Sequence, residues 1–370
     1  MILSNDFGRQ WDEIRDDVLQ VTEEVGASGW YILGQHVCRF EMNLAAFWTR
    51  QHAIGVASGL DAIEISLRIL GCRAGDRVLT SPISAFATVL AIVKLGAIPV
   101  FADCDRYGLI DLEACRELLK RNSAIRYFVP VHLYGHAMDL VELRNLRDEF
   151  DLKVVEDCAQ SIGARSNGVP TGSAGQLAAT SFYPTKNLGA LGDGGAILTD
   201  SAEGAAQARK LRDYGQSRKY VHDTIGYNSR LDELQAAFLD RAFLPRLDGW
   251  IERRRRIARR YCEEIDNRNI VVPGRPAGSE SAWHLFPVTV AADRKADLRR
   301  HLQLHEIQTG EHYPIALIEQ PALRDVPVEA PDDCTSARRF CHGELSLPIH
   351  PYLSDDEVSR VIAASNSWSG

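Results

Sequence analysis

Short apolar runs alternate with segments of helical period between residue 53 and about residue 200. This alternation is typical of a parallel β-sheet whose strands are joined by crossover helices. The apolar runs predict seven strands, at Ala53–Ala57, Arg77–Ser81, Ile98–Asp103, Tyr127–Leu133, Lys153–Asp157, Ala179–Tyr183 and Ala196–Thr199. The segments between them predict four helices, at Gly59–Leu70, Ala85–Leu95, Leu112–Arg121 and Leu140–Phe150. We therefore expect an α/β domain in this part of the chain.

The pattern changes after Arg230, where a helical stretch over Leu231–Leu239 continues past Pro245 and arginine becomes frequent. The remaining chain predicts one strand and three helices, at Leu285–Ala291, Trp250–Ile265, Lys295–His305 and Asp355–Ser365. The first 25 residues have the spacing of an amphipathic helix that packs on the body or on another subunit. We expect this helix and a large domain over residues 1–245, and a smaller domain over residues 246–370.

Composition narrows the class of protein. Of the 370 residues, 45% are hydrophobic and 25% are charged, which is typical of a globular protein with a large core. The 42 basic and 50 acidic side chains give a net charge of −8, which argues against a nucleic-acid binder. No apolar run reaches 18 residues and the N-terminus is charged, so we expect neither a membrane span nor a secretory signal. Eight cysteines without a C-x-x-C pair indicate reduced thiols in a cytoplasmic protein, without a metal.

The stretch Ser181–Gly195 carries a lysine, Lys186, just beyond a predicted strand and ahead of a glycine-rich loop. Open α/β sheets bind ligands at the carboxyl ends of their strands. A lysine amine held there can form a Schiff base with a carbonyl cofactor, if burial or a neighbouring cation lowers its pKa. A lone lysine after a strand is more often a surface residue, and this glycine-rich loop is not a Walker loop. Lys186 by itself therefore predicts no activity.

Another predicted strand ends in an acidic residue, Asp157, within the run Val154–Gln160. A carboxylate in the same cleft can pair with a protonated pyridine nitrogen, which makes the ring of pyridoxal phosphate (PLP) an electron sink. Asp157 could equally cap a helix that follows the strand. Taken together, Lys186 and Asp157 fit a PLP site.

A third segment, Val56–Ile63, predicts a strand, a turn of small residues and a helix start. Exposed backbone N–H groups at a helix start, together with the helix dipole, favour a phosphate. The alternative is that Ser58 only caps the helix. The segment supports a PLP site but does not specify one.

Five motifs, in chain order, resemble those of the DegT/StrS sugar aminotransferases: GVASGLDAI, VVEDCAQSIGA, SFYPTKNLGALGDGG, GYNSRLDELQAA and EHYP. The similarity extends from Ser28–Gly34 to Leu345–Pro348, which is nearly the whole chain. Members of this family are fold type I PLP enzymes that aminate keto-sugar nucleotides. The resemblance implies an α/β large domain with a mixed, mostly parallel seven-stranded sheet between helices, plus a smaller α+β C-terminal domain.

The matching positions imply a role for each site residue. Lys186 is implied to bind PLP covalently, Asp157 to pair with its ring nitrogen and Gln160 to contact its ring hydroxyl. The residues implied to hold the phosphate are Ser58, Gly59, Leu60 and Ser181, with Asn228 reaching in from a neighbouring subunit. That last role requires a homodimer with shared active sites.

Other positions imply contacts that are less well defined. Phe86 is the candidate for the aromatic residue that covers the cofactor ring, although it could equally be a core residue beneath its helix. The positions of Tyr183, His312 and Tyr313 resemble substrate-facing positions of the family. Leu60 stands where many relatives have a threonine, so phosphate binding there would rest on backbone N–H groups.

The resemblance implies transfer of an amino group from glutamate to a nucleotide-linked keto-6-deoxyhexose, and EHYP and the NSRLDE segment favour carbon C-3. A C-4 keto-sugar or a keto-inositol, which would give an aminocyclitol, stays open, because Ile318 and Leu323 replace a histidine and a tyrosine common in relatives. A non-catalytic regulator that binds PLP or a sugar is an alternative of another class. A dehydratase of this fold would carry histidine in place of Lys186.

Two further groups of residues need an interpretation. The arginines of residues 253–260 are expected to form a solvated helix surface that pairs with Glu252, Glu263 and Glu264. His132 and His136 follow a predicted strand near the proposed cleft, and we favour structural or cleft-lining roles over metal binding.

Overall fold

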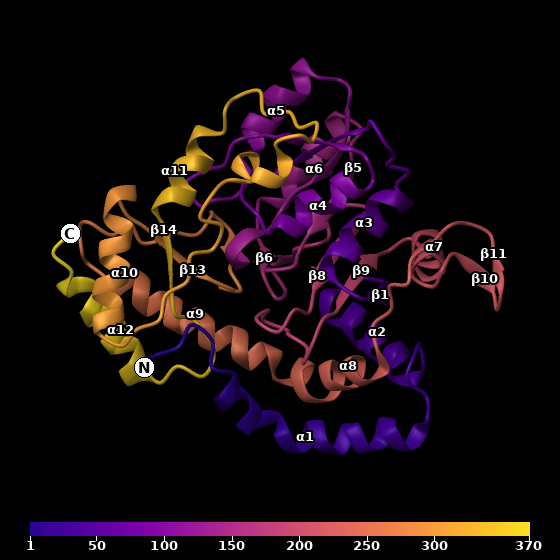
Figure 1. The fold of residues 1–370 in the computed structure, drawn as a ribbon, viewed down its shortest axis with the longest axis horizontal. Helices are drawn as coiled ribbons and strands as arrows, with labels where there is room; N and C mark the ends of the chain where they lie inside the picture. The colour runs from indigo at the N-terminus through magenta and orange to yellow at the C-terminus, as the bar shows by residue number, and fades with distance from the viewer.

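Seven strands form the central sheet of the computed structural model, which describes residues 1–370 (Figure 1). Their order across the sheet is β1-β9-β8-β5-β4-β2-β3. The bounds are β1 (His52–Val56), β2 (Arg77–Thr80), β3 (Ile98–Phe101), β4 (Ile125–Val129), β5 (Lys153–Asp157), β8 (Leu177–Ser181) and β9 (Gly195–Thr199). Only β9 is antiparallel to its neighbours. The expected mixed, mostly parallel seven-stranded sheet is confirmed.

Two predicted strands lie earlier in the chain than expected. Strand β8 (Leu177–Ser181) begins and ends two residues before the expected Ala179–Tyr183. The other strand is β4. The prediction places it at Tyr127–Leu133, whereas β4 ends at Val129. Pro130 follows and has no N–H group to donate to a neighbouring strand. The chain then forms a short 3-10 turn over Leu133–Gly135, in which Tyr134 has a left-handed φ of 59°. Val131 still pairs with Asp157 as an isolated parallel bridge, and the extended pairing ends where this turn begins.

Helices cover both faces of the sheet, as an α/β fold requires. The helices of this part of the chain are α1 (Phe7–Ser28), α2 (Gln35–Trp48), α3 (Gly59–Ile69), α4 (Phe86–Lys94), α5 (Leu112–Arg121), α6 (Leu140–Glu149), α7 (Ala202–Arg212) and α8 (Glu233–Phe238). Helices α3 and α7 share an apolar cluster with one face of the sheet. On the other face, α1, α2 and α8 pack at one end and α5 and α6 at the other. The amphipathic N-terminal helix is confirmed, and its buried residues lie in this core.

A carboxylate from α8 caps the start of α2. Glu233 is buried and accepts hydrogen bonds from the backbone N–H groups of Gly34, His36 and Val37, at 2.7, 2.9 and 2.8 Å. The capping residue Gly34 has no side chain to do this itself, and a Cβ there would lie 2.8 Å from Oε2 of Glu233. Two of the segments that carry the family resemblance therefore meet for a structural reason.

Glu233→Gln is expected to destabilise the protein by about 1 to 3 kcal/mol. The substitution removes the charge at the helix start and turns an amide N–H₂ group toward one of the three N–H donors. Urea unfolding of the variant measures the loss. The neighbouring Asp232 is exposed, and Asp232→Asn is the matched control, with a change of less than about 0.5 kcal/mol expected. Equal stability of the Glu233→Gln variant and the wild type would contradict the capping role.

The C-terminal part of the chain forms a second body, seen on the left of Figure 1. A π-type turn and a 3-10 turn over Leu239–Arg246 join α8 to the long helix α9. The elements are α9 (Leu247–Glu264), β13 (Phe286–Thr289), α10 (Lys295–Leu304), α11 (Thr335–Gly343), β14 (Glu344–Leu347) and α12 (Asp355–Ser367), around an antiparallel β13-β14 pair with its own apolar cluster. The division at residues 245 and 246 stays a prediction.

The remaining strands are short: β6 (Arg165–Ser166), β7 (Val169–Pro170), β10 (Gln216–Arg218), β11 (Val221–His222) and β12 (Ser279–Glu280). Strands β6, β7 and β12 form one small sheet, and β10 and β11 form a hairpin that projects from the body in Figure 1. No helix of the chain is both long and apolar enough to cross a bilayer.

Only part of the arginine-rich helix α9 is the solvated surface that its sequence predicts, since Arg256 and Arg259 are exposed but other arginines are not. Arg254 is buried, and its Nη1 donates to the carbonyl groups of Trp283, His284 and Ile349 at 3.2, 3.3 and 2.6 Å. Arg255 also donates to backbone carbonyls. Of the expected pairs with glutamates, only that of Arg260 with Glu264 forms. Arg254 and Arg255 join α9 to the rest of the molecule, because their N–H groups donate to loop carbonyls that would otherwise lack a hydrogen-bond partner.

Candidate active site

Most of the predicted site residues lie at the carboxyl ends of parallel strands, where α/β sheets bind ligands. Strand β5 ends at Asp157, and β8 ends at Ser181, five residues before Lys186. Strand β1 ends two residues before Ser58, the capping residue of α3. Three segments far apart in the sequence therefore open onto one cleft.

Asp157 is buried and held in a fixed orientation. Its Oδ2 accepts a hydrogen bond from Thr88 Oγ1 at 2.8 Å, and its Oδ1 accepts one from the backbone N–H of Ala159 at 3.0 Å. Ser84 and Thr88 hydroxyls are 2.7 Å apart and continue the chain of hydrogen bonds. Burial raises the pKa of Asp157, while these hydrogen bonds and the charge of Lys186 oppose the rise. The carboxylate is thus oriented before any ligand binds.

The ammonium group of Lys186 makes no hydrogen bond, and Asp157 is the only charged group that affects its pKa. Its turn is fixed instead by the backbone, since the Lys186 N–H donates to Tyr183 O at 2.8 Å. The side-chain amide of Asn187 donates to Ala282 O at 2.9 Å, which ties the turn to the C-terminal body. Burial lowers the pKa of Lys186 to about 8, and Asp157 opposes this shift. Near neutral pH a substantial share of the amine is therefore unprotonated and nucleophilic.

Capture of added PLP by the cofactor-free protein is expected to follow the titration of Lys186. A pKa lowered to about 8 means that the neutral amine dominates above this pH and falls about tenfold per pH unit below it. Stopped-flow absorbance between pH 6 and pH 10 should therefore show a rate that rises and then levels near pH 8. A rate that still rises tenfold between pH 9 and pH 10 would contradict the lowered pKa.

The start of α3 packs closely against the end of β8. Ser58 caps α3, with its Oγ accepting from the Asp61 N–H at 3.1 Å, and its hydroxyl hydrogen remains free to donate. A Cβ at Gly59 would lie 2.6 Å from the Cβ of Ser181, so only glycine allows these segments to approach so closely. The N–H groups of Gly59 and Leu60 belong to the first helical turn and have no intrahelical acceptor. Hydroxyl and N–H donors thus converge as a phosphate requires.

Gln160 and Tyr313 meet on one side of the cleft. The side-chain amide of Gln160 donates to the Tyr313 hydroxyl at 2.6 Å and its Oε1 accepts from the Tyr134 N–H at 2.7 Å. Tyr313 has a left-handed φ of 68°. The EHYP motif therefore contributes to the same site as the strand end, and the neighbouring His312 lies close enough to Lys186 for that charge to affect its titration.

Four predicted residues are not drawn into this cluster. Phe86 begins α4 and packs partly against the apolar cluster beneath that helix. Leu60 packs against the cluster on the opposite face of the sheet. The side chain of Tyr183 is 53% exposed, and that of Asn228 is exposed and makes no hydrogen bond. No contact in the structure assigns a role to these four side chains.

Sequence patterns missed Thr88 and His284. Thr88 lies in the segment that contains Phe86, but only folding places its hydroxyl on Asp157. His284 is buried, its Nδ1 has no partner, and burial followed by the charge of Lys186 lowers its pKa well below the usual value. His284 therefore lies near Lys186 in the folded chain.

His132 and His136 have different surroundings. His132 Nδ1 accepts from the Met138 N–H at 3.2 Å, which leaves the proton on Nε2 to donate to Glu156 at 2.9 Å. His132 and Glu156 lie beside Cys158, but both ring nitrogens of His132 are already used within the protein. His136 is buried with neither ring nitrogen bonded, and its ring lies edge-on to Trp283 with centroids 4.9 Å apart. Both histidines therefore support the structure around the cleft.

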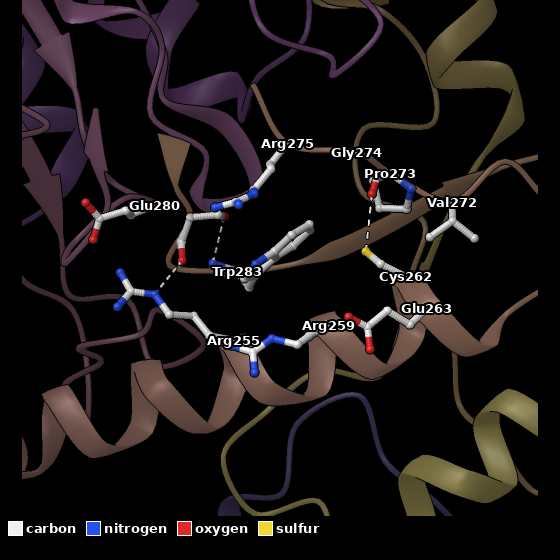
Figure 2. A pocket seen from close by; sticks show the side chains of 11 residues that line it. Arg255, Arg259, Cys262, Glu263, Val272, Pro273, Gly274, Arg275, Glu280 and Trp283 are labelled. Carbon is white, nitrogen blue, oxygen red and sulfur yellow. Dashed lines mark hydrogen bonds between the residues drawn. The ribbon is translucent and has the colours of Figure 1, made fainter. Parts of the chain in front are cut away.

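A larger cavity lies apart from the cluster of Lys186 and Asp157. It measures about 620 Å³ and lies between α9 and the segment before β13 (Figure 2). Its charged lining comprises Arg255, Arg259, Arg275, Glu263 and Glu280, beside Trp283 and Cys262. Arg255 donates to Ser281 O within this lining (Figure 2), and Arg275 donates to Ser279 O. None of the predicted site residues lines this cavity.

Known proteins resemble the chain over almost its full length. The family model DegT/DnrJ/EryC1/StrS aminotransferase family matches residues 12–366. The erythromycin biosynthesis sensory transduction protein EryC1 of Saccharopolyspora erythraea is 41% identical over 354 residues, 95% of each chain. The dTDP-3-amino-3,4,6-trideoxy-alpha-D-glucose transaminase of Streptomyces venezuelae is 40% identical over 369 residues, 98% of this chain and 95% of that one.

Solved structures agree with these relatives. S. venezuelae DesV in complex with a ketimine intermediate has a TM-score of 0.94 and 38% identity, covering 99% of this chain and 98% of that one. NtdA from Bacillus subtilis with its bound cofactor PMP has a TM-score of 0.87 and 29% identity, covering 96% and 81%. The fold and the site define a PLP-dependent aminotransferase. The chain belongs to the DegT/DnrJ/EryC1/StrS aminotransferase family.

Proposed function

We propose that this protein transfers an amino group from glutamate to C-3 of a nucleotide-linked keto-6-deoxyhexose. The observation that carries the proposal is the unpaired amine of Lys186, with its pKa lowered to about 8, in the same cleft as the oriented carboxylate of Asp157. The relative named as a dTDP-3-amino sugar transaminase supports an amino sugar as product and C-3 as the aminated carbon.

The residues at the strand ends fit PLP. The start of α3 with Ser58 and Gly59 would offer donors for the phosphate, and the absence of a side chain at Gly59 lets Ser181 approach this helix start. Bound PLP supplies an aldehyde that links to amines and a ring that withdraws electrons from the adjacent carbon. Asp157, aligned by Thr88 and Ala159, would hold the proton on the ring nitrogen.

Lys186 and Gln160 would act on two different substituents of that ring. Lys186 would hold the cofactor covalently and, once displaced by the amino donor, would move a proton within the cleft as a general base and acid. Gln160, fixed between the Tyr134 N–H and the Tyr313 hydroxyl, would contact the ring hydroxyl. Tyr183, His312 and Tyr313 would face the sugar, and Phe86 would cover the ring face.

The proposed assembly is a cytoplasmic homodimer in which Asn228 completes the phosphate site of the other subunit. Asn228 is exposed and free of hydrogen bonds in its own chain, whereas the adjacent Ser229 is buried and bonded to Asp61 at 2.6 Å. The apolar side chains of Trp30 and Tyr31 are 63% and 58% exposed, as expected of a surface covered by a second copy.

Absorbance spectroscopy followed by a substrate panel tests the proposal. The purified protein is expected to show a visible band with PLP that bleaches on addition of glutamate and returns on addition of a 3-keto-6-deoxyhexose nucleotide. C-4 keto-sugar nucleotides and keto-inositols serve as comparison acceptors. Return of the band with one of those alone would overturn the C-3 assignment. Absence of turnover with every donor, despite bound PLP, would favour a regulatory protein, the kind of function in the name of one relative.

A further inference from the structure

A buried chain of polar groups connects His312 to the interior of the C-terminal body. His312 Nδ1 lies 2.9 Å from Ser346 Oγ, and the Ser346 hydroxyl in turn bonds to Glu344 Oε1 at 2.5 Å. The other carboxylate oxygen of Glu344 accepts the backbone N–H of His312 at 2.8 Å. Glu344 and Ser346 are two residues apart on β14, so both side chains lie on the same face of the strand.

The backbone holds these three groups in register. Gly310 pairs with Ser346 through two backbone hydrogen bonds, of 3.0 and 2.7 Å, which brings the EHYP segment alongside β14. A Cβ at Gly310 would lie 2.5 Å from Cε1 of His312, so the glycine leaves room for the imidazole. Glu344 and Ser346 are 0% and 2% exposed, while His312 is only half-buried.

The hydrogen bonds determine which nitrogen of His312 carries the proton. When Glu344 is ionised it can only accept, so the Ser346 hydroxyl hydrogen points to it. Ser346 Oγ then accepts from His312, which puts the imidazole proton on Nδ1. Nε2 keeps a lone pair and has no hydrogen-bond partner in the protein.

We propose that Glu344, Ser346 and His312 form a proton relay that serves the carbonyl oxygen of the keto-sugar as this oxygen leaves as water. The inference rests on the proposed function. The entering amino group loses two protons and the leaving oxygen gains two. A relay that accepts each proton from the nitrogen and donates one to the oxygen therefore ends with the number of protons it began with. His312 would be the group that touches the substrate, through Nε2.

Each transfer along the relay balances. A proton enters at His312 Nε2, the Nδ1 proton passes to Ser346 Oγ, and the hydroxyl proton of Ser346 passes to Glu344 Oε1. Three bonds to hydrogen form and three break, and the imidazole is neutral before and after. The reverse sequence returns a proton from Nε2 to the oxygen.

The surroundings explain why a relay is needed. Burial, and then the charge of Lys186, lower the pKa of His312 to about 4, so a lone imidazole here would hold little charge near neutral pH. Burial raises the pKa of Glu344 to about 8, against the hydrogen bonds from Ser346 and the His312 backbone. The proton is therefore better held by Glu344 than by the imidazole. The other titratable groups that influence Glu344, or are influenced by it, are Lys295, Glu311, Tyr134, Tyr313 and Cys341.

NMR of imidazole nitrogens in the cofactor-free protein tests the geometry without any reaction. In Glu344→Gln, the amide oxygen must accept from the backbone N–H of His312. The amide N–H₂ group is then left to donate to Ser346 Oγ. Ser346 then donates to Nδ1, so His312 is expected to hold the Nε2–H tautomer in this variant. In the wild type above pH 9, where Glu344 is ionised, His312 is expected to hold the Nδ1–H tautomer. A His312→Asn variant identifies the signal. The same tautomer in wild type above pH 9 and in Glu344→Gln would overturn the relay.

Half-reaction kinetics of the PLP-loaded protein test the role. Ser346→Ala should leave the bleaching by glutamate within about twofold of wild type, and slow the return of the band with keto-sugar by about 10²-fold. Ser346→Thr, which keeps the hydroxyl, should restore most of that rate. Ser365→Ala is the matched control, because Ser365 is also fully buried in the C-terminal body but bonds only to Val361 O, and it should change neither half.

The outcomes separate the relay from the proposed function. Equal rates of the sugar half-reaction in Ser346→Ala and wild type would overturn the relay and leave the aminotransferase intact. A wild type that does not respond to glutamate would overturn the proposed function, and the tautomer measurement would still decide whether the relay exists.

Discussion

Replacement of Lys186 by alanine is expected to remove turnover almost completely, by about 10⁴-fold or more. The amine would both hold the cofactor and move the proton in each half of the reaction, so one substitution removes two functions. Its ammonium makes no hydrogen bond and interacts only with the charge of Asp157, so the substitution breaks no native hydrogen bond. The fold is therefore expected to persist, with a thermal midpoint close to that of the wild type.

The measurement is turnover with glutamate and a keto-sugar nucleotide, together with the visible spectrum. The variant should still bind PLP through the phosphate region, but its band should differ from that of the wild type and should not recover after the donor is removed. Lys120→Ala is the matched control, because Lys120 is an exposed lysine paired with Glu117. Activity of Lys186→Ala within tenfold of the wild type would show that another amine serves the cofactor.

The substitution Asp157→Asn is expected to reduce turnover by at least about 10²-fold while the protein remains folded. Asparagine has nearly the same shape and can still accept from Thr88 or Ala159, but it has no charge to keep the ring nitrogen protonated. Turnover and the circular dichroism spectrum of the variant should be compared with those of the wild type. Near wild-type turnover would refute the assignment of Asp157.

The adjacent residue Glu156 provides a sharp control for Asp157. Successive strand residues point to opposite faces, and Glu156 points away from the cleft, where it accepts N–H bonds from Gly172, Ala174 and Gly175 as well as from His132. Glu156→Gln should therefore lower the free energy of unfolding by about 2 to 4 kcal/mol. Its folded fraction should keep normal turnover. An equal loss of turnover in Glu156→Gln and Asp157→Asn would contradict the assignment of a catalytic role to Asp157 alone.

Catalytic candidates at strand ends could be predicted from local sequence, because a polar residue that ends or follows a strand is its neighbour in the chain. Asp157 and Lys186 were found in this way, and the family resemblance gave them roles. Thr88 could not be found, because it lies 69 residues from the carboxylate that it orients. The link between His312 and Ser346 spans 34 residues and depends on the pairing of Gly310 with β14.

Arg254 and Glu233 show the same limit from the structural side. In the sequence they are charged residues on helices, and helical spacing predicts solvent. In the structure each is buried and satisfies several backbone groups at once. A charged side chain is buried only where carbonyl or N–H groups are available to bond to it. The packing of distant segments decides which loop brings such groups to a helix.

The sequence by itself determined the alternation of strands and helices, the mostly parallel sheet, the family and the strand-end positions of Lys186 and Asp157. These depend on local periodicity and on motifs within short stretches of chain. Only the tertiary structure decided that burial lowers the pKa of Lys186, that Glu156 and Asp157 differ in environment, and that Glu344 lies behind His312. Desolvation and hydrogen bonding depend on what surrounds a group in space, and those surroundings come from segments that are distant in the chain.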